Sequence, residues 1–192
     1  MNKTWRNTLI LTIITLVSGL ALGLVYEITK DPIAKAQEDA KKAAWQEVFP
    51  ETDLNAFEAL DVDAKIADQA IKSAGVNATI DEVCKAGEDG YVVTTTDKEG
   101  YGGDIQVTVG ITADGTVNGI SILSINETAG LGMKAAEPAF YEQYEGKQTE
   151  SFYVSKDGGS GEPIDALSGA TITSRAMTGA VNAALAYYQN AF

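Results

Sequence analysis

The architecture of this 192-residue chain is set by one segment, Ile105-Gln-Val-Thr-Val-Gly-Ile-Thr112-Ala-Asp114-Gly115-Thr-Val117-Asn-Gly-Ile-Ser-Ile-Leu-Ser-Ile125. Apolar and polar residues alternate from 105 to 112, and β-branched residues recur from 117 to 125, which is typical of strands with one buried face. The Asp-Gly pair between the two runs is a strong hairpin signal. A third β-rich run, Tyr91 to Thr96, precedes them. The segment therefore predicts consecutive antiparallel strands.

Helical patterns follow the strands. We expect a helix from Ala135 to Tyr144, a loop from Gly158 to Pro163, and a C-terminal helix after Thr173. The last prediction rests on apolar residues that recur at the spacing of one helical face: Met177, Ala180, Val181, Ala184, Leu185 and Tyr188. Residues 53–88 alternate short acidic helical pieces with apolar spots and show no clear motif. Strands followed by helices predict an α+β domain with an antiparallel sheet and flanking helices.

The N-terminal segment has the properties of a membrane span. No charged residue occurs in the 20 residues from Asn7 to Tyr26, enough helix to cross a hydrocarbon core of about 30 Å. Lys3 and Arg6 precede the run, so the positive-inside rule predicts a cytoplasmic N-terminus and an extracytoplasmic remainder. The alternative is a cleaved signal peptide, since Ala21-Leu22-Gly23 is an acceptable cleavage site. The length of the run favours an uncleaved single-pass anchor in the lipid of the cell membrane.

Three parts are therefore expected along the chain. Residues 1–30 hold the cytoplasmic N-terminus and the anchor, whose span covers about residues 7–26. Residues 31–50 form a juxtamembrane helix that ends at Val48-Phe49-Pro50. Residues 51–192 form one extracytoplasmic domain, long enough to bury a core of its own.

The composition excludes several classes of function. The chain has 14 basic and 27 acidic residues and a formal net charge of −13, which argues against a nucleic-acid partner. Cys84 is the single cysteine, so neither an intrachain disulfide nor an iron–sulfur cluster held by several cysteines of this chain is possible. The chain has no histidine, which excludes His-based catalytic triads, haem ligation by histidine and the common zinc sites. We expect no metal site.

A hydroxyl-rich motif, Asp165-Ala-Leu-Ser168-Gly169-Ala170-Thr171-Ile-Thr173, stands where loop gives way to helix and is followed by Ser174. The first turn of a helix offers unpaired N–H groups and the positive end of the helix dipole, which together suit a phosphate. A threonine there could also carry a phosphate group covalently. The plain alternative is that these hydroxyls only cap the helix.

A second motif comes directly after the third strand: Glu127-Thr128-Ala-Gly130-Leu131-Gly132-Met-Lys134. Its glycines allow the backbone to approach a flat group closely, and Leu131 offers an apolar contact. The alternative is a simple connector between strand and helix. The glycine-rich stretch Gly100–Gly103 is interpreted as a turn, because no Lys-Ser/Thr pair follows it as in a phosphate-binding loop.

The hydroxyl-rich motif resembles the flavinylation motif Asp-x-x-Ser/Thr-Gly-Ala-Ser/Thr-x-Ser/Thr. In that motif a dedicated flavin transferase joins FMN through its phosphate to the last hydroxyl. The resemblance implies that Thr173 carries covalent FMN through a phosphoester bond. It also implies a set of residues around the attachment point: Asp165, Ser168, Gly169, Ala170, Thr171 and Ser174.

Almost the whole chain resembles one family. The N-terminal anchor, Val-Phe-Pro, Gly-Tyr-Gly-Gly-Asp-Ile, Glu-Thr-x-Gly-Leu-Gly-x-Lys and Ser-Gly-Ala-Thr-Ile-Thr-Ser occur in the order found in the G subunit of the Rnf electron-transport complex. The chain is also similar to the C subunit of the sodium-pumping NADH:quinone reductase, which shares the FMN-binding domain. Two positions depart from the family pattern, since Ile125 and Ala129 stand where relatives often have His and Pro. The resemblance implies that the second motif lies against the flavin through Glu127, Thr128, Gly130, Leu131, Gly132 and Lys134.

The resemblance further implies an electron-relay role in an ion-translocating ferredoxin:NAD⁺ oxidoreductase, so that the chain is part of an enzyme as one of its components. FMN performs the redox chemistry, and the chain itself would bind no nicotinamide nucleotide. The implied partners are the D, A and E membrane subunits, with the flavin on the D subunit as a redox neighbour. Two alternatives stay open at this point: the C subunit of the quinone reductase, and an anchored non-redox binding domain in which Thr173 is merely a cap.

Overall fold

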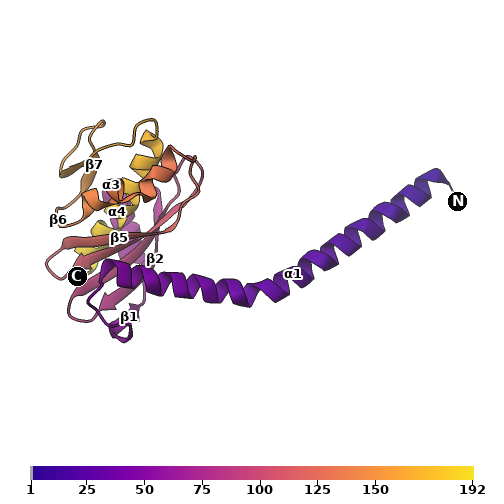
Figure 1. Cartoon of the computed structure of the whole chain (residues 1–192), viewed down its shortest axis with the longest axis horizontal. Coiled ribbons are helices and arrows are strands. Elements are labelled where there is room, and N and C mark those ends of the chain that lie inside the picture. Colours follow the sequence, from indigo (N-terminus) through magenta and orange to yellow (C-terminus); the bar gives the residue numbers. More distant parts are fainter. Residues whose placement is uncertain (1) are drawn as a thin grey trace. The chain divides into compact units, whose positions relative to one another are not determined.

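The computed structural model describes residues 2–192, which separate into two compact units, one ending at Ala40 and one from Lys41 to Phe192. Helix α1, Lys3–Val48, runs through both (Figure 1). The remaining helical elements belong to the second unit: η1 (Leu54–Ala56), α2 (Ala64–Ala74), η2 (Gly132–Ala136), α3 (Pro138–Tyr141), η3 (Glu142–Tyr144) and α4 (Thr171–Ala191).

The first unit contains the apolar part of α1 and the charged stretch that follows it as far as Ala40. The helix is long and apolar enough to cross a membrane, with a mean hydropathy of 2.4 over its best 18-residue window and none of that window buried. Inside this stretch Thr8, Thr12 and Thr15 donate their hydroxyls to the carbonyl four residues earlier, which satisfies their polar groups within the helix itself. α1 then continues without interruption until Val48, so the predicted helix end at Val48-Phe49-Pro50 is confirmed.

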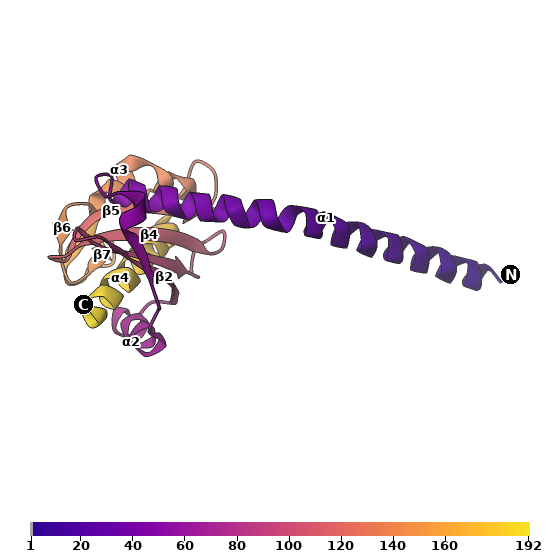
Figure 2. The ribbon, with the colours of Figure 1, turned by 90° about the horizontal axis from the view of Figure 1, so that it is seen from below.

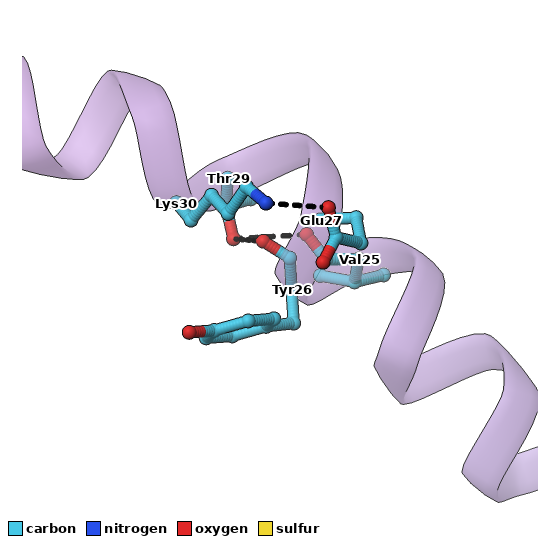
Figure 3. A network of polar contacts seen from close by, with 5 residues as sticks. All are labelled: Val25, Tyr26, Glu27, Thr29 and Lys30. Atoms are coloured by element: carbon cyan, nitrogen blue, oxygen red, sulfur yellow. Dashed lines mark hydrogen bonds and ion pairs between the residues drawn. The ribbon is translucent and has the colours of Figure 1, made fainter.

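Charged side chains appear where the apolar run ends. The Lys30 ammonium lies 2.7 Å from the Glu27 carboxylate, and the Thr29 hydroxyl donates to the carbonyl of Val25 at 2.9 Å. Figure 3 shows these residues on the helix. The pair lies three residues apart on one face of the helix, the spacing at which opposite charges support an exposed helix. The predicted limit of the span near Tyr26 therefore coincides with a change from apolar side chains to paired charges.

The second unit is built on a six-stranded antiparallel sheet in the order β1-β2-β3-β4-β5-β6. Its strands are β1 (Phe57–Leu60), β2 (Ala78–Ala86), β3 (Gly90–Asp97), β4 (Ile105–Thr112), β5 (Thr116–Ser124) and β6 (Lys147–Gln148). β3, β4 and β5 confirm the three predicted strands. Gly115 at the β4–β5 turn has a φ of +86°, a conformation that glycine adopts without strain and that the predicted hairpin requires. A small parallel pair, β7 (Phe152–Val154) and β8 (Glu162–Ile164), stands apart from the main sheet.

Alternation along the strands gives the sheet two different faces. In β4, Ile105, Val107, Val109 and Ile111 belong to the main core, whereas Gly110 lies on the opposite face. Helix α4 covers the apolar face, and α2 packs beside it (Figure 2). Five of the six predicted apolar positions of α4 are buried, and Tyr188 is half-buried against the same core, which confirms that helix. The buried five are Met177, Ala180, Val181, Ala184 and Leu185.

The last turn of α1 packs on the other face of the sheet. Val48 sits against Gly110 and Gly119, whose missing side chains leave room for it. The Asn118 side-chain amide donates to the Val48 carbonyl at 2.5 Å, which pairs one of the carbonyls left over at a helix end. Cys84 belongs to the same apolar cluster and is fully buried. Burial raises the pKa of its thiol to about 12, so very little of the reactive thiolate forms near neutral pH.

Three predicted segments differ from the structure. Within residues 53–88 η1 and α2 are helical as expected, but β1 and β2 are strands that the alternation of helical pieces and apolar spots did not predict. Strand β2 carries a bulge between Ile80 and Glu82, and this irregularity hides its alternation. The loop predicted for 158–163 ends at Gly161, because β8 begins at Glu162. The helix predicted for 135–144 is broken into short pieces, since Pro138 begins a new turn there.

Candidate functional site

A cavity of about 490 Å³ lies where the loop after β5 meets the start of α4. Its walls come from three separate segments: the turn before β4, the loop that follows β5, and the first turn of α4. The lining residues are Tyr101, Glu127, Thr128, Leu131, Gly132, Gly169, Ala170, Thr171, Ile172 and Thr173. Both motifs singled out in the sequence therefore contribute to one cavity.

Thr173 is buried in the first turn of α4, with 1% of its surface exposed. Within residues 2–192 its hydroxyl takes part in no hydrogen bond. The adjacent Ser174 hydroxyl, in contrast, accepts from the Leu167 amide and donates to the Ala170 carbonyl, both at 3.0 Å. Of these two neighbouring hydroxyls, that of Ser174 is hydrogen-bonded on both sides, and that of Thr173 faces the cavity without a partner among residues 2–192.

The first turn of α4 has no side-chain cap. Ala170 is the N-cap residue and makes no side-chain hydrogen bond. The first backbone bond of the helix runs from the Ser174 amide to the Ala170 carbonyl, so the amides of the three preceding residues have no partner within the helix. Thr173 lies inside the helix rather than at its cap, and the interpretation of Thr173 as a simple capping residue is therefore wrong. The free amides and the helix dipole suit a phosphate group.

Glu127 brings an unpaired carboxylate oxygen to the cavity. Its Oε1 accepts from the Gly102 amide at 3.2 Å, and the residue is 8% exposed. Its Oε2 is buried without a hydrogen-bond partner among the residues that the structure describes. Leaving a buried carboxylate oxygen unpaired costs free energy, so a site with an unmet acceptor next to a cavity is one built to receive a donor.

Gly132 lies between these two groups. A Cβ atom at this position would stand 2.7 Å from both the Glu127 Oε2 and the Thr173 Oγ1, closer than non-bonded atoms approach one another. Only glycine fits here, and the close approach brings the carboxylate, the hydroxyl and the backbone of the loop together. The sequence predicts that the loop glycines allow the backbone to approach a flat group, whereas the groups that Gly132 approaches here are the side chains of Glu127 and Thr173.

The mouth of the cavity is apolar. Tyr101 is 70% exposed, Ile172 47% and Leu131 43%, which is unusual for side chains of this size on a domain whose other large apolar residues are mostly buried. The Leu131 side chain also reaches over Gly169, coming within 3.3 Å of the place where a Cβ would stand. The cavity thus has a polar floor, at Thr173 and Glu127, and an apolar rim.

Some residues named from the sequence lie away from the cavity. Ser174 turns its hydroxyl toward Leu167, and Ser168, Gly130 and Lys134 are exposed and line no part of the cavity. Gly130 has a φ of +75° and open space where a Cβ would stand, so its role is conformational. Sequence reasoning missed Tyr101, Ile172 and Gly102. The available signal for Tyr101 was its position, because it is an aromatic residue in a glycine-rich turn and lies outside any strand.

Comparisons with known proteins agree with this geometry. Residues 100–186 match the family model of the FMN-binding domain, and residues 1–48 match that of the RnfG N-terminal region. The G subunit of the Na(+)-translocating ferredoxin:NAD(+) oxidoreductase complex of Acetobacterium woodii is 38% identical over 189 residues, which cover 95% of this chain and 90% of that protein. Its counterpart in the proton-translocating ferredoxin:NAD(+) oxidoreductase complex of Clostridium ljungdahlii is 34% identical over 186 residues, with 96% and 91% covered.

Solved structures show the same fold. The C subunit of the Na(+)-translocating NADH-quinone reductase of Parabacteroides distasonis superimposes with a TM-score of 0.55 at 19% identity, covering 82% of this chain and 94% of that one. The NqrC of Shewanella oneidensis gives a TM-score of 0.51 at 20% identity, with 78% and 91% covered. At these identities the likeness concerns the fold alone, whereas the RnfG relatives match along nearly their full length. The chain belongs to the RnfG family, the G subunits of ion-translocating ferredoxin:NAD(+) oxidoreductase complexes.

Proposed function

We propose that this chain carries FMN through a phosphoester bond to Thr173 and relays electrons within an ion-translocating ferredoxin:NAD⁺ oxidoreductase complex. The observation that carries the proposal is the Thr173 hydroxyl, which is unbonded at the floor of a cavity, in the uncapped first turn of α4. The match to the FMN-binding domain and the RnfG relatives support the same conclusion.

The residues of the cavity fit FMN part by part. Unpaired amides in the first turn of α4 suit the phosphate. The unpaired Oε2 of Glu127 suits a hydroxyl of the polyol chain, which can donate to it. Tyr101, Leu131 and Ile172 suit the apolar faces of the ring system. A volume of about 490 Å³ is within the range of cofactor sites.

Bound FMN supplies reversible electron transfer, and the protein supplies attachment, orientation and electrostatics. Linkage through the phosphate leaves the ring unmodified and close to the exposed rim, where another redox group can approach. We propose the D, A and E membrane subunits as partners and a flavin transferase as the enzyme that forms the bond. The remaining residues named in the flavinylation motif act in recognition by that transferase.

The site is tested by labelling variants in cells that contain a flavin transferase. Wild type should fluoresce on a denaturing gel, and Thr173→Ala should be dark. Thr171→Ala should keep part of the label, because we assign its hydroxyl to recognition. Ser174→Ala is the matched neighbour, and it should keep the label if it folds. A mapped peptide with FMN on Thr171 or Ser174 would falsify the assignment.

We also propose that the N-terminus is cytoplasmic and that the domain faces the outside of the cell. The support is the charge-free run of α1 preceded by Lys3 and Arg6. The exposed loop residue Ser160 offers a test. Ser160→Cys, made in a Cys84→Ser background, should react with an impermeant thiol reagent in intact cells. The parent with Cys84 alone should not react, since that thiol is fully buried. Reaction of Ser160→Cys only after lysis would place the domain in the cytoplasm.

A further inference from the structure

Thr173, which carries the acceptor oxygen proposed above, is almost completely covered by the protein and reaches the surface only through the cavity. Thr173 is 1% exposed, and the Gly132 backbone covers its Oγ1 so closely that no Cβ would fit. Phosphoryl transfer needs an attacking oxygen, a phosphorus and a leaving group roughly in line, with the groups of a transferase around them. The cavity has room for a flavin nucleotide after attachment. It offers no room for a transferase at an oxygen this deeply buried.

The two walls around Thr173 are held with very different strength. On the helix side, Ser174 makes two hydrogen bonds and the Thr178 hydroxyl donates to the Ser174 carbonyl at 2.8 Å. The residues that follow, such as Met177 and Ala180, are completely buried in the main core. Moving this wall would therefore break the core of the domain.

The loop side is held only at its edges. Glu127 fixes one end through the Gly102 amide, and the buried Ala135 fixes the other. Between them, residues 128–133 are exposed except for Gly132, and their backbone hydrogen bonds stay mostly within the segment. Segments with few buried contacts open at the smallest cost in free energy.

We infer that residues 128–133 form a lid that must open before Thr173 can be flavinylated. This inference rests on the proposed function. In the open state the Thr173 oxygen attacks the flavin phosphate of a pyrophosphate-linked flavin nucleotide. The new O–P bond forms as the pyrophosphate P–O bond breaks, a nucleoside monophosphate leaves, and the hydroxyl proton passes to a base of the transferase. The lid closes over the product, so the closed structure is the arrangement that holds the flavin.

Gly130 provides a way to change the lid without touching the cavity. Its φ of +75° is unfavourable for any residue with a side chain, while the space around its Cβ position is empty. Gly130→Ala should therefore destabilise the closed lid through the backbone alone. If the open fraction limits the reaction, the initial rate of flavinylation rises in proportion, and we expect roughly a fivefold increase. Gly146→Ala is the matched control, with a φ of +68°, open space and a position outside the lid.

The experiment uses the full-length protein, produced without flavin and purified in detergent, with a flavin transferase and flavin adenine dinucleotide. Two quantities are measured for each variant: the initial rate of flavin incorporation, and the hydrogen exchange of the peptide that contains residues 128–133. We expect both to increase in Gly130→Ala and neither in Gly146→Ala. Leu131→Ala, which removes the contact with Gly169, should act in the same direction and replaces Gly130→Ala if that variant does not fold.

The outcomes separate the lid from the site. Faster exchange in the lid with a wild-type rate of flavinylation would overturn the lid while leaving Thr173 as the acceptor. A wild-type protein that incorporates no flavin at Thr173 would overturn the proposed function itself. Flavinylation that is faster in Gly146→Ala to the same degree would also overturn the lid, because the effect would then come from general loosening of the domain.

Discussion

Two hollows in this domain are made by glycine, and they are filled differently. On one face of the sheet, Gly110 and Gly119 leave a space that Val48 of α1 occupies. At the start of α4, Gly132 leaves a space that the side chains of Thr173 and Glu127 occupy, and both of these residues line the cavity. The first hollow attaches one element to another, whereas the second leaves a cavity with an unpaired oxygen. The same residue type thus serves either packing or binding, and the difference lies in what stands opposite to it.

The largest effect should come from filling the second hollow. Gly132→Ala puts a methyl group 2.7 Å from the Thr173 oxygen and from the Glu127 carboxylate. This clash destabilises the closed arrangement of residues 128–133, so we expect their hydrogen exchange to become faster by about tenfold or more. The measurement is hydrogen exchange of the peptide that contains residues 128–133. Gly158→Ala, with a φ of +68° and open space around it, is the control and should leave the exchange of that peptide as in wild type. Unchanged exchange in Gly132→Ala would mean that the loop accepts a methyl group at this position without opening.

Filling the first hollow should instead affect stability. Gly110→Ala brings a methyl group 2.8 Å from the Val48 Cβ, and overpacking of this kind costs about 1–3 kcal/mol of the free energy of unfolding. Denaturation of the detergent-solubilised protein, followed by circular dichroism, measures this loss. Flavin labelling of the folded fraction should be unchanged. If labelling falls together with stability, the two hollows are coupled and the comparison fails.

A third glycine, Gly179, lies close to the carboxylate of Asp97. A Cβ on Gly179 of α4 would stand 2.6 Å from the Asp97 Oδ2, and Asp97 is 2% exposed. Desolvation raises the pKa of this carboxyl to about 6. The folded state therefore holds a proton that the unfolded state releases, and the stability contributed by protonated Asp97 is lost as the pH rises from about 4 through about 6.

Asp97→Asn should remove that loss. We expect the free energy of unfolding at pH 8 to rise by about 1–2 kcal/mol relative to wild type, and the slope of stability between pH 4 and pH 6 to become flatter. Denaturation series at several pH values provide both quantities. An unchanged slope would show that the carboxylate keeps its charge beside Gly179.

The smallest effect is expected at Gly119. Its Cβ position lies 3.3 Å from the Val48 Cα, so a methyl group requires only a slight shift. Alanine also lowers the entropic cost of fixing a strand residue relative to glycine. We expect Gly119→Ala to change the free energy of unfolding by less than about 0.5 kcal/mol. A loss of stability as large as that of Gly110→Ala would mean that Val48 cannot shift to make room for a methyl group at either glycine.

Much of this arrangement is predictable from local patterns. The strands from Gly90 to Ser124 alternate clearly and are joined by an Asp-Gly turn, so periodicity and turn chemistry identify them without tertiary information. The strands β1 and β2 do not, because β1 is short and β2 combines charged residues with a bulge. The strand conformation of β2 depends on pairing with β3, and that of β1 on pairing with β2, which a local pattern does not contain.

Local patterns likewise predict one part of the candidate site and miss another. The order of residues in two motifs predicts which segments meet, and both contribute to the cavity. Which hydroxyl is unpaired is a matter of tertiary contacts: Ser174 is bonded to Leu167, seven residues away, and Thr173 is not. Tyr101 comes to the rim from a turn that reads as an ordinary connection. No spacing rule relates it to α4.

The burial of the Thr173 oxygen also bears on how long an attached flavin persists. A phosphoester formed there has its bridging oxygen behind Gly132, in a position that 1% exposure leaves nearly dry. Hydrolysis needs water in line with that bond, and a phosphodiesterase needs still more space. The linkage would therefore be protected for as long as residues 128–133 stay closed over it. Loss of the cofactor would require the same segment to reopen, so the lifetime of the flavin would depend on how rarely it opens after attachment.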